Sequence, residues 1–197
     1  MISPLNDLDG ELADAVSRYE AQGEMGRLHE RLAELADGAD ADALMQAVEP
    51  FGHIPEVAGP VYERVVAAQP SNARALVILA NAYWLAGRGP EVVGELATRA
   101  MAADPANRGA WHLWALTESN PRQRTARWGQ VVARFPTDLL AKSILADNAA
   151  SLAGAEHDSE AQVLAIATYE ELLAVAEHPE QRRALETAIK TLRGWRL

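Results

Sequence analysis

Three arginines lie close together in the segment NPRQRTARW, and their spacing could bind an anion. Arg122, Arg124 and Arg127 fall within six residues, directly after the Asn120-Pro121 break. A proline at the start of a helix places Arg122 in the first turn, where backbone N–H groups and the helix dipole favour negative charge. Guanidinium groups add bidentate hydrogen bonds to a carboxylate or a phosphate. The alternative is that these arginines pair with carboxylates of neighbouring helices or cover apolar surface with their stems.

Two segments partly resemble metal-binding motifs, but neither has the complete pattern. His29-Glu30 starts like the zinc motif H-E-x-x-H, but Ala33 occupies the position of the second ligand. The acidic segment 156–160 lacks the glycine and the spacing of a calcium loop. The chain has no cysteine, which excludes thiolate ligands, disulfides and cysteine nucleophiles. We therefore expect no metal, no cofactor and no catalytic residue, and we predict that the chain is not an enzyme.

The helices that position these side chains can be predicted from a sequence pattern that recurs where helices are expected to end. Four segments share it: VVAAQPSN, AMAADPAN, VVARFPTD and AVAEHPEQ, with prolines at 70, 105, 136 and 179. A proline inside a helix costs about 3 kcal/mol or more, so we interpret these prolines as the ends of helices rather than as kinks. Asn107 follows Pro105 at the position that would cap the next helix.

The segment 73–107 is the clearest repeat unit. Apolar residues recur at helical spacing in its first half and again in its second half. Between the halves, Gly87 suits the end of one helix and Pro90 suits the first turn of the next. The sequence therefore predicts a hairpin of two helices in about 34 residues.

This unit resembles the tetratricopeptide repeat. The residues that carry the resemblance are Leu76, Leu79, Ala80, Tyr83, Gly87, Ala100 and Pro105. It departs from the family motif at Ala80, where glycine is commoner, and at Leu76, where the family has tryptophan. The next unit, with Trp111 in that place, resembles the half-repeat variant of RNA-processing scaffolds.

The fold class that follows is all-α: an α-solenoid of antiparallel helical hairpins, a tetratricopeptide-like superhelix with a C-terminal capping helix. Alternating strand patterns and hairpin turn pairs are nearly absent from the sequence. We expect a single helical-repeat domain over 1–197. Its parts are a degenerate N-terminal hairpin over 7–37, repeats over 39–72, 73–107, 108–138 and 139–179, and a cap helix over 180–197. The last repeat is expected to have a long loop, AGAEHDSE, between its helices.

The resemblance implies that a peptide or protein segment binds along the concave side, on the first helix of each unit. The residues placed there are Arg74, Val77, Asn81, Trp84, Gly109, His112, Leu116, Ser143 and Asp147. Val77 occupies the position at which repeats that bind a terminal carboxylate have lysine. A more apolar ligand is therefore at least as compatible with this surface as a terminal carboxylate. Trp84 is expected to face outward because Tyr83 takes the packing position beside it. The other central tryptophans, Trp111, Trp114 and Trp128, are expected in the core.

Negative charge is concentrated in the first third of the sequence. The net charge is −10, and residues 1–70 carry all of it, with 4 basic and 14 acidic residues. An acidic surface argues against general nucleic-acid binding and is compatible with a solvated face or with docking of a basic partner. The beginning of the sequence lacks the pattern of a signal peptide, and no stretch is apolar enough to cross a membrane. We therefore expect a cytoplasmic protein, and the bias toward arginine over lysine is typical of bacteria with GC-rich genomes.

The predicted function is that of a protein–protein interaction scaffold or adaptor without a chemical step. Its partner would be a protein or peptide, and a regulatory subunit of an enzyme complex is one form of this role. Two alternatives remain open: a structural subunit that assembles with copies of itself, and binding of RNA or another anion through the strip from Arg122 to Arg134.

Overall fold

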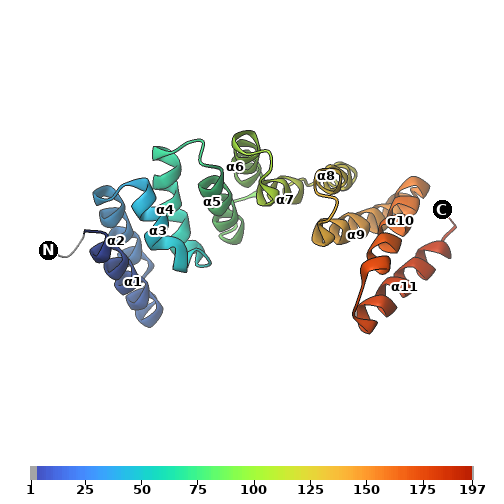
Figure 1. Cartoon of the computed structure of the whole chain (residues 1–197), viewed down its shortest axis with the longest axis horizontal. Helices are drawn as coiled ribbons and strands as arrows, with labels where there is room; N and C mark the ends of the chain where they lie inside the picture. The colour runs from blue at the N-terminus through green and yellow to red at the C-terminus, as the bar shows by residue number, and fades with distance from the viewer. Residues whose placement is uncertain (1–3, 197) are drawn as a thin grey trace. The chain divides into compact units, whose positions relative to one another are not determined.

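The computed structural model describes residues 4–196, and within this range every regular element is a helix (Figure 1). This confirms the all-α prediction. The helices are α1 (Pro4–Gln22), α2 (Met25–Gly38), α3 (Ala41–Val48), α4 (Pro55–Ala68), α5 (Ala73–Leu85), α6 (Pro90–Ala103), α7 (Arg108–Leu116), α8 (Pro121–Arg134), α9 (Leu139–Glu156), α10 (Ser159–Val175) and α11 (Pro179–Arg193), with a 3-10 turn, η1 (Glu49–Phe51), after α3.

The chain divides into two compact units, Met1–Thr117 and Glu118–Leu197. The boundary falls inside the predicted 108–138 repeat, so that α7 belongs to the first unit and α8 to the second.

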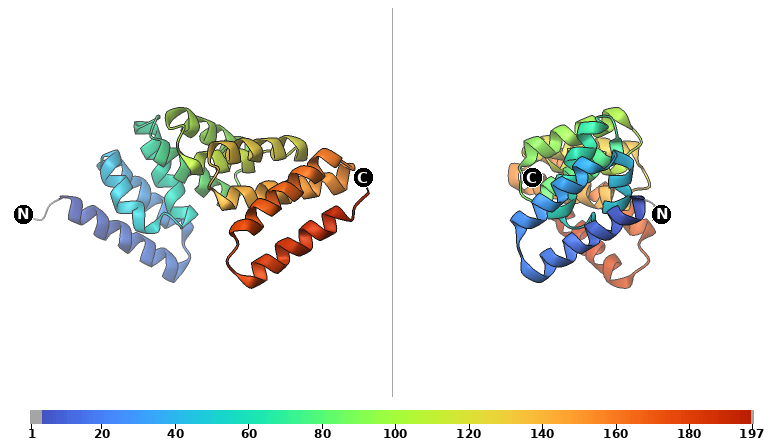
Figure 2. Two further views of the ribbon diagram at one scale, coloured as in Figure 1. Left: turned by 45° about the vertical axis from the view of Figure 1, so that its right-hand side comes forward. Right: turned by 90° about the vertical axis from the view of Figure 1, so that its left-hand side faces the viewer.

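The first unit is built from helices that pack against the next helix in sequence or the next but one. Helix α1 packs on α2, α3 on α4, α5 on both α4 and α6, and α7 on α6 and α5. Figure 2 shows these pairs from two further sides. One continuous apolar core runs through the unit, with large side chains such as Leu12, Leu32, Tyr62 and Leu76 fully buried.

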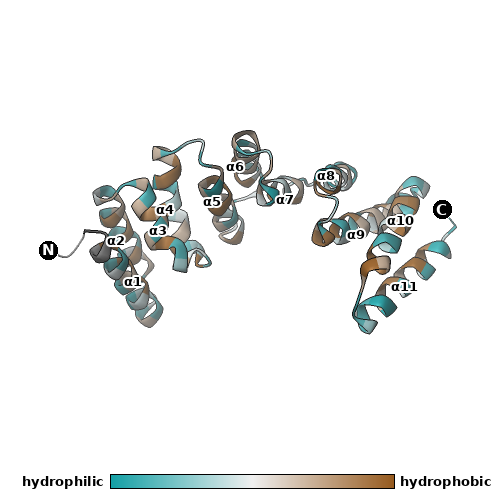
Figure 3. Cartoon of the chain, in the orientation of Figure 1, coloured by the Kyte–Doolittle hydropathy of each residue, from teal (hydrophilic) through white to brown (hydrophobic). Residues whose placement is uncertain are grey.

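The second unit has a core of smaller side chains. Helix α9 packs against α8 on one side and α10 on another, and α11 packs on α10. Alanines at 146, 149 and 165 are fully buried between these helices, so the helices approach closely. In Figure 3, apolar and polar stretches alternate along α10, and Val163 and Leu164 on this helix are exposed. No helix within residues 4–196 has both the length and the apolar character needed to cross a membrane.

Side-chain caps fix where several helices begin. Asn72, Asn107, Asn120 and Asp138 each accept a hydrogen bond from the backbone N–H three residues later, at 3.0–3.2 Å. The prolines at 70, 105 and 136 each lie directly after the residue that caps the end of a helix, which confirms that they separate helices. Pro179 differs because it occupies the first turn of α11, and three residues separate it from the end of α10.

The turn between α5 and α6 also follows the sequence prediction. Gly87 has a φ of +70°, a conformation that glycine adopts without strain, and the N–H of Arg88 bonds to the carbonyl of Tyr83 at 3.0 Å. Pro90 lies in the first turn of α6.

The predicted long loop over 153–160 is wrong. Helix α9 continues to Glu156 and α10 begins at Ser159, so two residues connect them. The segment is rich in alanine and glutamate, which favour helix, and His157 ends α9 in the left-handed region with a φ of 54°. Asp158 then caps α10 by accepting hydrogen bonds from the N–H groups of Glu160 and Ala161.

Candidate functional site

Helices α5 and α7 bring together most of the residues that were predicted to bind a partner. Each of them is joined to α6 by a four-residue connection, so the two run in the same direction. They meet where Val77 faces Gly109: a Cβ atom on Gly109 would lie 3.2 Å from Cγ1 of Val77. The helices therefore approach closely because position 109 has no side chain.

Beyond this contact, both helices present exposed side chains at matching positions. Trp84 and Leu116 each follow the contact by seven residues, and their exposed fractions are 37% and 40%. Asn81 is exposed and His112 is half-buried, one turn closer to the contact. We call this surface the α5–α7 face; its residues are Arg74, Val77, Asn81, Trp84, Gly109, His112 and Leu116.

The outward position of Trp84 is explained by its neighbour Tyr83. The Tyr83 hydroxyl donates a hydrogen bond to Oε1 of Glu63 on α4 at 2.7 Å, and Cζ of Arg88 lies 5.1 Å from the ring centre. Burial and the hydrogen bond to Glu63 raise the pKa of Tyr83 to about 12. Because Tyr83 packs toward α4, the next residue on the helix points away from it, as predicted.

The prediction of core positions for three other tryptophans is confirmed for Trp128, which is buried. Trp111 and Trp114 are only half-buried and contact each other edge to face, with ring centres 5.8 Å apart. The indole N–H of Trp111 donates to the carbonyl of Pro105 at 3.0 Å. Trp111 thus braces the connection that precedes α7.

Two further predicted residues, Ser143 and Asp147, lie on α9 in the second unit. Ser143 is half-buried. Asp147 accepts a hydrogen bond from the Tyr169 hydroxyl at 2.6 Å, and burial together with this bond raises the pKa of Tyr169. The carboxylate of Asp147 thus links α9 to α10.

The arginine cluster of α8 holds carboxylates of its own unit. Arg122 pairs with Glu156 at 2.6 Å and with Asp158 at 2.7 Å, and both pairs raise its pKa. The pKa of Asp158 is lowered, first by the hydrogen bond from the backbone N–H of Ala161 and then by Arg122. Arg122 therefore ties the start of α8 to the connection between α9 and α10.

The other two arginines of this cluster are also engaged. Arg124 donates from Nε to Asn148 at 2.7 Å, and Arg127 pairs with Glu118 at 2.8 Å. A pocket of about 260 Å³ lies beside Arg122 and is floored by Leu152. Pairing with carboxylates, which the sequence offered as the alternative to an anion site, is thus present in the structure. The anion site at Arg122, Arg124 and Arg127 stays a prediction.

The acidic segment 156–160 does not gather metal ligands. Among the described residues, no group of three or more histidine, aspartate or glutamate side chains converges as a metal site would require. Glu156 and Asp158 instead face Arg122.

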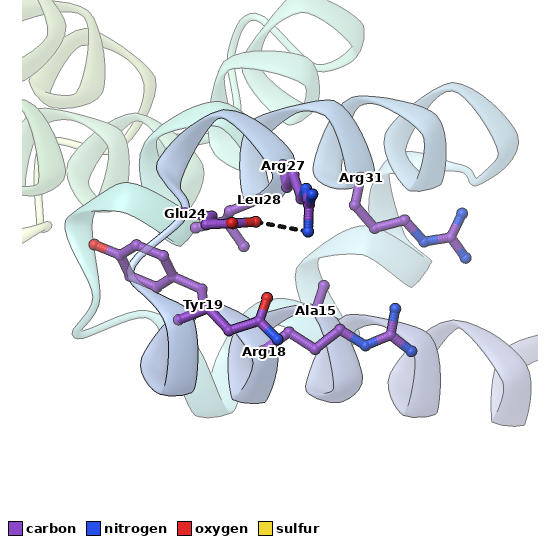
Figure 4. A pocket seen from close by; sticks show the side chains of 8 residues that line it. Ala15, Arg18, Tyr19, Glu24, Arg27, Leu28 and Arg31 are labelled. Carbon is purple, nitrogen blue, oxygen red and sulfur yellow. Dashed lines mark ion pairs between the residues drawn. The ribbon is translucent and has the colours of Figure 1, made fainter.

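A pocket between α1 and α2 is a site that the sequence analysis missed (Figure 4). Its lining residues are Ala15, Arg18, Tyr19, Gln22, Glu24, Arg27, Leu28 and Arg31. The sequence did contain an indication: residues 1–70 have four basic residues, and three of them fall between positions 18 and 31. In an acidic segment, such a grouping of arginines is a charge pattern in its own right.

Comparison with known proteins identifies the fold. No family model and no curated protein matches the chain. Among solved structures, a TPR protein of Thermus thermophilus, TTC0263, is similar with a TM-score of 0.56 and 17% identity, over 93% of this chain and 99% of that one. PilF of Pseudomonas aeruginosa has a TM-score of 0.59 at 14% identity, covering 95% and 90%. A tetratricopeptide repeat protein of Parabacteroides merdae has a TM-score of 0.56 at 14% identity, covering 98% and 74%. The chain therefore has a tetratricopeptide-like helical-repeat fold.

Proposed function

We propose that this chain is a protein-interaction scaffold or adaptor that binds a segment of a partner protein on the α5–α7 face. The observation that carries the proposal is the exposure of Trp84 and Leu116 at the same level of two helices that run in parallel. Tryptophan is enriched among the residues that dominate binding energy at protein interfaces. The mechanism is burial of apolar surface, without a chemical step.

The character of the face indicates what kind of segment it binds. Trp84 and Leu116 offer an apolar surface for a large side chain, and the exposed amide of Asn81 can bond to the backbone of an extended or helical ligand. Arg74 pairs with Glu49 at 2.6 Å, and Val77 packs on Gly109. Neither residue is arranged to hold a terminal carboxylate, so the ligand is more apolar than acidic at this face.

The test is a comparison of wild-type protein with Trp84→Ala. Proteins captured from the native host are identified by mass spectrometry, and the purified partner is then titrated by calorimetry. Loss of the tryptophan should weaken binding about 30-fold or more, as expected for a residue at the centre of an interface. The melting temperature should change little because Trp84 is exposed.

Val92→Ala is the matched control, since Val92 is an exposed apolar residue on the neighbouring helix α6. It should leave the affinity unchanged. Equal affinities of wild-type protein and Trp84→Ala for the purified partner would remove the α5–α7 face from consideration. Participation of Ser143 and Asp147 is tested in the same titration by substituting each with alanine.

Self-assembly is a second candidate function, and the exposed apolar residues of α10 favour it. Val163, Leu164 and Val175 are exposed in the second unit, and such a helix is typical of a surface covered by a partner. Size-exclusion chromatography with light scattering tests it directly. A mass of one chain at all concentrations would exclude it.

A further inference from the structure

The outer face of α11 carries positive charge. Residues 179–197 contain five basic and two acidic residues, a net charge of +3. Leu192 lies buried in the core of the second unit. Because a helix has about 3.6 residues per turn, Arg183 and Lys190 lie on the side of α11 opposite Leu192, and both are exposed. In the part of the chain that the structure describes, no carboxylate pairs with either of these two cations.

The other two arginines of α11 differ in how far their charge is balanced. Arg182 donates hydrogen bonds to the backbone carbonyls of Leu173 and Ala176, both at 3.0 Å. Carbonyl groups have no net charge, so Arg182 adds to the positive field of the helix. Arg193 pairs with the carboxylate of Glu170 on α10, which balances its charge.

The α1–α2 hairpin carries the opposite charge. Residues 4–38, which span the two helices, contain nine acidic and three basic residues, a net charge of −6. The three arginines pair with acids of the hairpin itself, and such pairing leaves the excess of six negative charges unchanged. Glu30, Glu34 and Asp37 are exposed and lie on the side of α2 opposite the buried Leu32.

The acids on this side of α2 are accessible to a further cation. Glu34 pairs with Arg31 at 2.8 Å and Asp37 pairs with Arg64 at 3.1 Å, and the two carboxylate side chains are 66% and 67% exposed. Exposed pairs of this kind are weak, and a carboxylate can accept hydrogen bonds from more than one donor. Among the described residues, no basic side chain pairs with Glu30.

The opposite charges of α2 and α11 have the same spacing. Glu30 and Asp37 are seven residues apart on α2, and Arg183 and Lys190 are seven residues apart on α11. Seven residues correspond to about two turns, or about 10.5 Å along a helix. Two helices that lie side by side can therefore form both ion pairs at once.

We propose that α11 of one copy of this chain docks on the outer face of α2 of a second copy. Arg183 and Lys190 of one copy would pair with Glu30 and Asp37 of the other. A second copy is the partner because the same chain supplies both charges at matching spacing. Each copy keeps one free surface of each kind, so further copies can add. The inference rests on the second candidate function, self-assembly, and is independent of the α5–α7 face.

The first measurement is the mass of the full chain in solution by sedimentation velocity, at low and at high ionic strength. At low ionic strength the mass should rise above the 21.3 kDa of one chain as the protein concentration increases. At about 1 M salt it should return to that of one chain, because exposed charges are then screened within about 3 Å. A mass of one chain under all conditions would overturn both this inference and self-assembly. Assembly that ignores salt and is abolished by Val163→Ser would overturn this inference alone.

The second measurement uses two charge-reversal variants, Arg183→Glu/Lys190→Glu and Glu30→Lys/Asp37→Lys. Each places like charges opposite one another and should weaken association about 30-fold or more. Mixed in equal amounts, the two variants should assemble again, because the reversed α11 of one matches the reversed α2 of the other. Lack of recovery in the mixture would overturn the pairing of these two helices. All four side chains are exposed, so far-UV circular dichroism should match that of wild type.

Arg99→Glu/Arg134→Glu is the matched control. These arginines are exposed on α6 and α8, so the variant changes the net charge of the chain as much as Arg183→Glu/Lys190→Glu does. It should leave the association unchanged. If it weakens association equally, the attraction depends on total charge and the proposed surfaces are wrong. Trp84→Ala should assemble as wild type does, which separates this contact from binding at the α5–α7 face.

Discussion

The arginines of α8 and those of the α1–α2 hairpin differ in where their carboxylate partners lie, most clearly for Arg122 compared with Arg18 and Arg27. Arg122 reaches Glu156 and Asp158, which are 34 and 36 residues away in sequence. Arg18 and Arg27 instead pair with acids three or four residues away on the surface. Arg122 connects helices of the second unit, whereas Arg18 and Arg27 leave their guanidinium groups exposed beside a pocket. Arg31 is the exception in the hairpin, because it pairs with Glu11 of α1 at 2.6 Å.

The burial of the carboxylate partners explains why the two arginine clusters are expected to differ in their effect on stability. The side chains of Glu118 and Asp158, which face the α8 arginines, are only 11% and 12% exposed. A carboxylate so far removed from water needs its cation, whereas an exposed carboxylate is solvated without one. Arginines grouped in sequence are thus no evidence for a ligand until the positions of the neighbouring acids are known.

The largest effect that distinguishes the clusters is expected for Arg127→Met. Methionine keeps much of the apolar stem but removes the charge that faces Glu118, whose carboxylate is then left poorly solvated. The free energy of unfolding should fall by about 2 kcal/mol. Urea unfolding followed by far-UV circular dichroism measures it.

Arg134→Met on the same helix is the control for this prediction. Arg134 is exposed, and Cζ of its guanidinium lies 5.7 Å from the ring centre of Phe135. Its loss should change the unfolding free energy by about 0.5 kcal/mol or less. Equal losses of unfolding free energy for the two variants would mean that Arg127 stabilises the fold through its aliphatic stem or through its positive charge in general, and not through its ion pair with Glu118.

The helix pattern could be predicted because its determinants are local. Pro105 and Asn107 lie within three residues of the helix ends they define, and Gly87 ends α5 by its own backbone conformation. The error at 153–160 arose where local preferences compete, since charged residues that are typical of a loop also favour helix. Two residues, His157 and Asp158, were enough to end one helix and cap the next.

The sites were less predictable because their contacts are not local. Spacing placed Asn81 and Trp84 on one face of α5, but the close approach to α7 depends on Gly109 lying opposite Val77. The partners of Arg122 could not be deduced from spacing, because they are the last residue of α9 and the residue that caps the start of α10. The unusual concentration of arginines could have indicated the α1–α2 pocket from the sequence. Its apolar floor could not have been predicted in this way.

A smaller, pH-dependent effect is expected at Asp158. Its pKa in the folded chain lies below the ordinary value of 3.8, so its contribution to stability is present above that pH and is lost as the pH falls through the lowered pKa. Asp158→Asn keeps a good helix cap but has no charge to titrate against Arg122. Thermal unfolding between about pH 5 and about pH 1 should show a larger fall in melting temperature for wild type than for the variant. Parallel curves for the two proteins would mean that the pair with Arg122 does not stabilise the unit.

The smallest effect on stability is expected in the α1–α2 hairpin, for Arg27→Met. Its pair with Glu24 is exposed and spans three residues of one chain segment, an arrangement that contributes about 0.5 kcal/mol or less. The unfolding free energy should therefore change by no more than this, and added salt should reduce the difference further because exposed pairs are screened. Urea unfolding at low and at high ionic strength measures both values. A loss as large as that of Arg127→Met would show that the ion pair of Arg27 stabilises the fold as much as that of Arg127, and the contrast between these two arginines would disappear.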